Sequence, residues 1–150
     1  LNNEDSKIIS DNITIISYLY RCTKSDRENN WLPYRELEGV GAAYDTFSQL
    51  GVNKLVNFFG HRGELFLKAG TQMGAKKFPL GDIGIELDVF PNVPMVLILW
   101  LADEEFEARA NILFDSSAPK ELHREDLAGL CSTVVKKLIK VAKELDFPRK

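Results

Sequence analysis

The sequence predicts an α+β fold: a helical N-terminal half, an antiparallel sheet of three or more strands, and a C-terminal helix packed on that sheet. Two observations support this class. Up to about residue 80, apolar side chains recur every three or four positions, as on one face of a helix, and after it they alternate or run continuously, as in strands. The end of the chain then returns to helical spacing.

Helices are expected in two stretches of the first half. Residues 13–22 predict a first helix, in which Ile16, Leu19 and Tyr20 recur at helical spacing and would form one buried stripe. Residues 44–74 predict short helices that glycine-containing turns separate from one another. The first half is therefore expected to be mainly helical.

Three strands are expected after the change of period. Apolar residues alternate with others in Asp82–Phe90 and again in Arg109–Phe114, which is typical of half-buried strands. Met95–Leu101 is continuously apolar, as expected of a central strand with both faces covered. The short connections between these segments favour an antiparallel meander.

The last helix has the clearest pattern in the chain. Its acidic residues come early and its lysines late, which suits the helix dipole. We expect its apolar stripe to pack on the sheet. The stripe consists of Leu127, Leu130, Cys131, Val134, Leu138, Val141 and Leu145.

Length and charge limit the classes of function. The 150 residues are expected to form one domain, residues 1–150, with residues 1–10 flexible or partly disordered. Acidic residues outnumber basic ones by 22 to 19, so the chain lacks the basic excess typical of nucleic-acid binding. It shows neither a signal-peptide layout nor an apolar run that could span a bilayer, so we expect a cytoplasmic protein that binds no membrane. The oligomeric state stays open.

The two cysteines do not suggest a metal site. Cys22 and Cys131 are far apart in sequence and outside any zinc-ligand spacing. In a reducing compartment we expect them to be unbridged.

Carboxylates provide one candidate site. In a meander, the start of the first strand and the end of the second meet at one edge, which would bring Asp82 close to Asp103, Glu104 and Glu105. Such oxygen ligands suit Ca²⁺ or Mg²⁺. The alternative is an exposed hairpin tip and an unrelated turn aspartate.

Histidine and aromatic residues provide further candidates. His61, in a glycine-flanked turn, could be a ligand or a base, or simply a surface residue. Aromatic side chains could wall a flat cofactor such as a tetrapyrrole, or form ordinary core. These aromatics are Trp31, Tyr34, Phe58, Phe59 and Phe66. Ser116 and Ser117 lack a nucleophile elbow, and no complete catalytic motif is present, so we do not expect an enzyme.

Several segments carry a resemblance to a known family. Residues 11–140 resemble an uncharacterised family of anaerobic bacteria and archaea, a domain of unknown function. The N-terminal part of the resemblance rests on Tyr18-Leu19 and Trp31–Leu37. The remainder rests on Gly81-Asp82, Phe90–Pro94, Leu99–Phe106, Ile112–Ala118 and Glu125–Leu127.

The resemblance implies no assigned activity. It implies that some relatives are fused to a Cys-rich iron–sulfur module of the kind found alongside corrinoid proteins. The 150 residues contain only two cysteines and therefore no such module, which argues against a direct redox role. Resemblance and geometry together give a candidate ligand-binding set of Asp82, Asp103, Glu105, His61, Trp100 and Asp115. Three hypotheses follow: a non-catalytic binding domain for a cofactor or small ligand, such as a tetrapyrrole or corrinoid; a carboxylate- or metal-dependent enzyme; and a protein that docks on an iron–sulfur or corrinoid protein.

Overall fold

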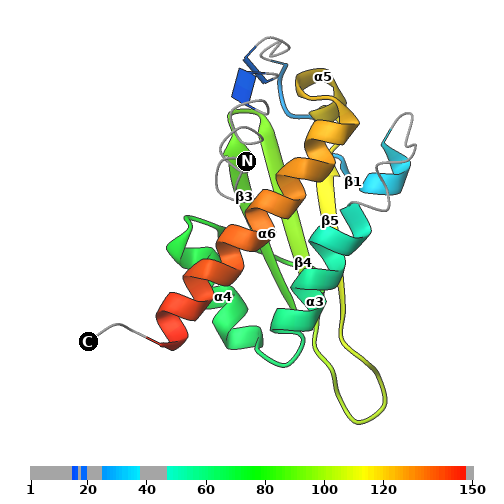
Figure 1. Ribbon diagram of the computed structural model, residues 1–150. Coiled ribbons are helices and arrows are strands. Elements are labelled where there is room, and N and C mark those ends of the chain that lie inside the picture. Colours follow the sequence, from blue (N-terminus) through cyan, green and yellow to red (C-terminus); the bar gives the residue numbers. More distant parts are fainter. Residues whose placement is uncertain (1–14, 17, 20–24, 38–46, 148–150) are drawn as a thin grey trace.

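The computed structural model describes residues 15–16, 18–19, 25–37 and 47–147. These residues form a five-stranded antiparallel sheet and a layer of helices, which confirms the predicted α+β class (Figure 1). The strands are β1 (Trp31–Pro33), β2 (Lys76–Phe78), β3 (Ile83–Phe90), β4 (Val93–Trp100) and β5 (Arg109–Asp115). The helices are η1 (Tyr34–Glu36), η2 (Ser48–Val52), α3 (Asn53–Phe59), α4 (Gly63–Gln72), α5 (Ala118–Glu121) and α6 (Arg124–Asp146).

The continuous apolar run forms the middle strand of the sheet. The strand order is β1-β5-β4-β3-β2, so β4 has a neighbour on each side. Leu97 of β4 pairs with Ile85 of β3 and with Ile112 of β5, and all three side chains are buried. The predicted meander is therefore confirmed, and the short edge strands β1 and β2 extend it on both sides.

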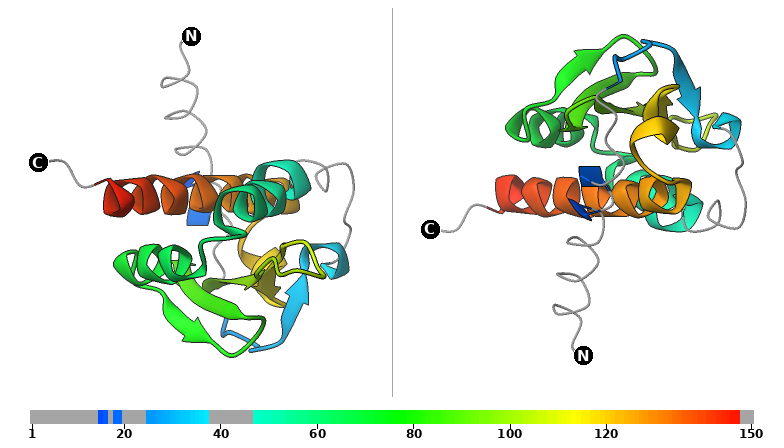
Figure 2. Two further views of the ribbon diagram at one scale, coloured as in Figure 1. Left: turned by 90° about the horizontal axis from the view of Figure 1, so that it is seen from below. Right: turned by 90° about the horizontal axis from the view of Figure 1, so that it is seen from above.

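Helices α3, α4 and α6 cover one face of the sheet (Figure 2). Helix α6 presents the predicted stripe to the core, where Leu127, Cys131 and Leu138 are fully buried. The prediction is wrong only at the end of the stripe, where Leu145 is 42% exposed. Helix α4 lies close to β3, since a Cβ added to Gly70 would be 2.6 Å from the Cδ1 of Ile85.

The other face of the sheet carries a second, smaller core. Val96, Ile98 and Leu113 are buried there. The helices that the structure describes lie on the opposite side of the sheet (Figure 2). The sheet curls enough for Trp31 of one edge strand to meet Phe78 of the other, with ring centroids 5.5 Å apart. Among the described residues, sheet twist and aromatic side chains thus cover this face of the sheet in place of a second layer of helices.

The predicted first helix is buried on a different face from the one expected. Ile16 and Leu19 are 65% and 69% exposed, so their predicted burial is wrong, while Tyr18 is 8% exposed. The Tyr18 ring stacks on Phe90 at 4.5 Å, and its hydroxyl donates to the carbonyl of Pro91 at 2.9 Å. These contacts of the aromatic residue determine which side faces the sheet. Tyr20 lies outside the described residues.

Two further predictions concern cysteines and membranes. Cys131 is buried and unbridged, whereas Cys22 lies outside the described residues, so the prediction for the pair stays untested. Of the helices that the structure describes, none combines the length and apolar character needed to cross a bilayer.

Candidate functional site

Asp82 and Asp103 both use their carboxylates to accept backbone N–H groups. The Asp82 carboxylate accepts the backbone N–H of Leu101 at 2.8 Å. The Asp103 carboxylate accepts those of Glu105 and Phe106 at 2.8 and 2.7 Å, which closes the tip of the β4–β5 connection. The contacts of Asp103 form a local turn, which is a common use of aspartate. The contact of Asp82 instead joins the start of β3 to the residue that follows β4.

His61 and the β4–β5 connection line one shallow surface hollow of about 490 Å³. Asp103 and Glu105 border it, but Asp82 does not. The backbone N–H of Ala102 donates to the carbonyl of Gly60 at 3.1 Å, which holds the two loops together. Among the described residues, no group of three or more histidine, cysteine, aspartate or glutamate side chains could hold a metal ion, so the expected cation site gains no support.

Trp100 lies on the other face of the sheet from the helices. Its ring packs against the small core of Val96, Ile98 and Leu113. The guanidinium of Arg109 lies 5.6 Å from the ring centroid, within the range of a cation–π contact. Packing accounts for this side chain without a ligand.

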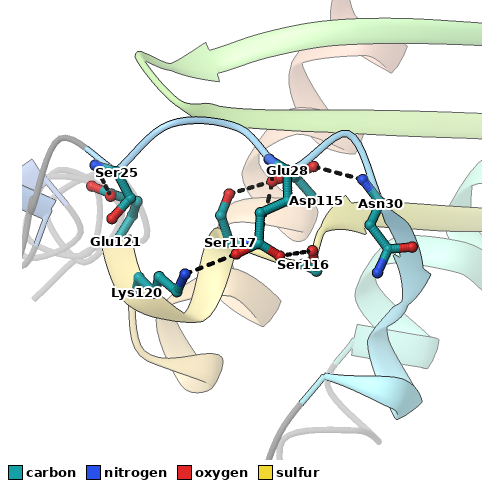
Figure 3. A network of polar contacts seen from close by, with 8 residues as sticks. All are labelled: Ser25, Glu28, Asn30, Asp115, Ser116, Ser117, Lys120 and Glu121. Atoms are coloured by element: carbon teal, nitrogen blue, oxygen red, sulfur yellow. Dashed lines mark hydrogen bonds and ion pairs between the residues drawn. The ribbon is translucent and has the colours of Figure 1, made fainter.

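Asp115 lies at the end of the sheet opposite Asp82 and Asp103, beside Pro94. The register pairs Phe114 with Met95 and so puts Asp115 next to Pro94. Its buried carboxylate accepts the backbone N–H groups of Glu28 and Asn30 at 3.0 and 3.2 Å (Figure 3). It thereby fastens the segment that leads into β1.

Ser117 completes the contacts of Asp115. It donates both its hydroxyl and its backbone N–H to the same carboxylate. Burial raises the pKa of Asp115, but the hydrogen bonds from Ser117, Glu28 and Asn30 outweigh this effect and bring it below the ordinary value. The carboxylate is therefore charged and fully engaged within the protein.

Glu28 and Glu121 extend this network on either side (Figure 3). Glu28 pairs with the Lys120 ammonium at 2.8 Å and accepts the Ser116 hydroxyl, and these two hydrogen bonds lower its pKa. The buried Glu121 accepts the backbone N–H of Ser25 at 3.1 Å. Acidic side chains thus hold residues 25–30 at three points, which is a structural role.

A largely apolar groove lies between α6 and β3, with a volume of about 410 Å³. Drug-sized ligands occupy pockets of roughly 300–1,000 Å³. The α6–β3 groove is lined by Ile15, Met73, Leu87, Asp88, Val89, Phe90, Leu130, Thr133, Val134 and Lys137.

The groove exists because the helices cover β3 unevenly. Helix α4 packs on the first half of β3, around Ile85, and ends near Met73. Tyr18 covers the far end of the strand by stacking on Phe90. Between them, Val89 is only partly buried, and a strip of β3 and α6 stays open to solvent.

Comparison with known proteins gives a family. The family model described as a domain of unknown function, DUF3786, matches residues 1–137. The chain belongs to this family, since the match spans nearly its whole length. This confirms the predicted membership of an uncharacterised domain family. No curated protein and no solved structure gives a significant match.

Sequence reasoning missed the groove. Leu130 and Val134 were expected to be ordinary core positions, and Phe90 the end of a strand. Tyr18 and Met73 come from segments that only the tertiary fold brings close to them. A usable signal was present in Lys137, a lysine beside the apolar stripe of α6.

Proposed function

We propose that this chain is a non-catalytic domain that binds a small, largely apolar ligand in the α6–β3 groove. The observation that carries the proposal is the groove itself, a solvent-open strip between α6 and β3. Of the ten described residues that line it, seven are apolar. Leu87, Leu130 and Val134 form its floor and keep 5–6% of their surface exposed. Ligand sites usually combine an apolar wall with a few polar groups, as here.

Flat cofactors are one class of candidate ligand. The sequence suggested a tetrapyrrole or corrinoid, and the groove offers Phe90 and aliphatic side chains as an apolar wall. Its open side leaves room for a ring system to extend into solvent. The proposal needs no metal ligand from the protein.

Titration with haemin, a corrinoid and 1-decanol tests the proposal. We expect saturable binding of at least one probe, followed by absorbance for the two cofactors and by calorimetry for decanol. Val89→Trp should fill the half-buried wall of the groove and abolish binding. Leu80→Trp, at an exposed position outside the groove, is the matched control and should bind as the unmodified protein does.

Two results would contradict the proposal. The first is failure of all three probes to bind to a folded protein. The second is equal binding to the Val89→Trp and Leu80→Trp variants, which would place the ligand elsewhere.

A protein-docking role is a second candidate, favoured by one observation. Phe106 is 66% exposed at the tip of the β4–β5 connection, which projects beyond α3 and α4 (Figure 1). Glu104, Glu105 and Glu107 flank it, so the partner would present an apolar socket with basic residues around it. Phe106→Ser should then weaken association with a purified partner protein that has such a socket. The same variant should leave ligand binding in the α6–β3 groove unchanged. An unaltered association would refute this role.

A further inference from the structure

We infer that the ligand of the α6–β3 groove carries an anionic group, such as a carboxylate, which Lys137 binds at the rim while an apolar body lies along the floor. This inference rests on the proposed function and specifies the chemistry of the same site.

The floor requires an apolar body. Leu87, Leu130 and Val134 supply only aliphatic surface, and Met73 and Val89 continue it on the walls. A polar group placed against this surface would lose its hydrogen bonds to water without replacement. The body of the ligand is therefore hydrocarbon or aromatic.

The rim supplies the charge. Two charged side chains occur among the described residues that line the groove, and one of them, Asp88, already pairs with Arg27 at 3.2 Å. Lys137 is exposed and takes part in none of the ion pairs formed by the described residues. Its ammonium is the charge at the rim that is free to meet a ligand.

Other residues of α6 near Lys137 are also positively charged. Between Asp126 and Glu144 the sequence contains four lysines, at positions 136, 137, 140 and 143, and no acidic residue. Lys136 and Lys140 are exposed neighbours of Lys137 on the same helix. These lysines put positive charge on the α6 side of the groove, although the whole chain is acidic.

Two kinds of molecule share this chemistry. A fatty acid has a flexible apolar chain and one carboxylate, and a tetrapyrrole has a flat apolar ring and carboxylate side chains. In both, the carboxylate would reach Lys137 and the apolar part would cover the floor. Comparing decanoate with haemin distinguishes a chain from a ring.

Calorimetric titration with decanoate and 1-decanol tests the charge directly, because the two probes share a chain and differ in the head group. We expect decanoate to bind roughly fivefold more tightly at low salt, the size of effect that an exposed ion pair gives. Lys137→Gln should remove this preference and leave decanol binding unchanged. Lys140→Gln, one turn along the helix and outside the groove, should keep the preference. Raising the salt concentration should weaken decanoate binding only.

Each outcome has a separate meaning. Equal affinities for decanoate and decanol, unchanged in Lys137→Gln, would overturn the anionic ligand and leave the proposed function intact. Loss of the preference in Lys140→Gln as well would overturn the specific role of Lys137. If decanoate, decanol and haemin all fail to bind, the proposed function falls together with this inference. If haemin binds in a manner that depends on Lys137 and decanoate does not bind, the inference is supported and the ligand is a ring with carboxylate side chains rather than a fatty acid.

Discussion

Replacing Asp115 with alanine should destabilise the protein more than any surface aspartate replacement. The buried carboxylate accepts backbone N–H groups from Glu28, Asn30 and Ser117, and the Ser117 hydroxyl as well. A hydrogen bond to a charged group contributes about 1.5–3 kcal/mol. Water can reach Glu28 and Asn30 once residues 25–30 detach, so the costs do not add fully. We expect a loss of about 3–5 kcal/mol, typical of breaking a buried charged network.

Urea unfolding of the Asp115→Ala variant beside an Asp82→Ala variant measures this cost. Asp82 is the matched control, because it is exposed and accepts one backbone N–H, from Leu101. Because water can replace this bond at an exposed site, the replacement should cost less than about 1.5 kcal/mol. Similar losses in the two variants, or a loss below about 1 kcal/mol for Asp115→Ala, would refute the clamping role of the Asp115 carboxylate.

The Asp115 carboxylate should also make the stability of the folded protein depend on pH. The pKa of Asp115 in the folded protein lies below its ordinary value of 3.8, because its hydrogen bonds outweigh its burial. A carboxyl group of this kind stabilises the folded state fully above its unfolded pKa, and its contribution falls as the pH drops through the folded pKa. The stability difference between the unmodified protein and Asp115→Ala should therefore be largest near neutral pH and shrink below about pH 4. A difference that is constant from pH 7 to pH 3 would contradict this.

Three further predictions concern the core. Leu138→Ala should cost about 2–5 kcal/mol in chemical unfolding, because the side chain is fully buried on α6; a loss below about 1 kcal/mol would show that the site relaxes or is not core. Gly84→Ala should detach β2 from β3, because the new Cβ would be 2.5 Å from the carbonyl oxygen of Phe78. Faster amide hydrogen exchange confined to residues 76–78 would show this detachment. Unchanged exchange of these amides would contradict the prediction. Burial raises the pKa of Tyr34 to about 12, so the unmodified protein should lose stability between pH 10 and pH 12, and Tyr34→Phe, which cannot ionise there, should lose less; parallel curves would contradict it.

The sequence predicted the elements whose patterns are local and strong. The unbroken apolar run Met95–Leu101 predicted a central strand, and β4 occupies that place because both of its faces are covered. The stripe on α6 predicted its buried face for the same reason. The edge strand β2 gave no such signal, since Lys76-Lys77-Phe78 has only one apolar residue and pairs on one side.

The candidate site was harder to predict because it depends on contacts between distant segments. The expected meander suggested that carboxylates at one edge of the sheet share a cation, and this stays a prediction. In the structure the Asp82 and Asp103 carboxylates accept backbone N–H groups, which no pattern in the sequence indicated. Asp115 was expected to bind a ligand and is instead engaged with the segment before β1. The groove depends on where α4 ends and on where Tyr18 stacks, and no local sequence pattern predicts either of them.

Chemical-shift mapping of a bound probe tests the central claim most directly. In ¹⁵N–¹H spectra, titration with decanoate should shift the amide signals of residues 87–90 of β3 and 130–137 of α6, which line the α6–β3 groove. Residues 102–108, which line the hollow beside His61, should stay unchanged. Shifts confined to residues 102–108, or no shifts at a concentration that saturates binding, would contradict a ligand site between α6 and β3.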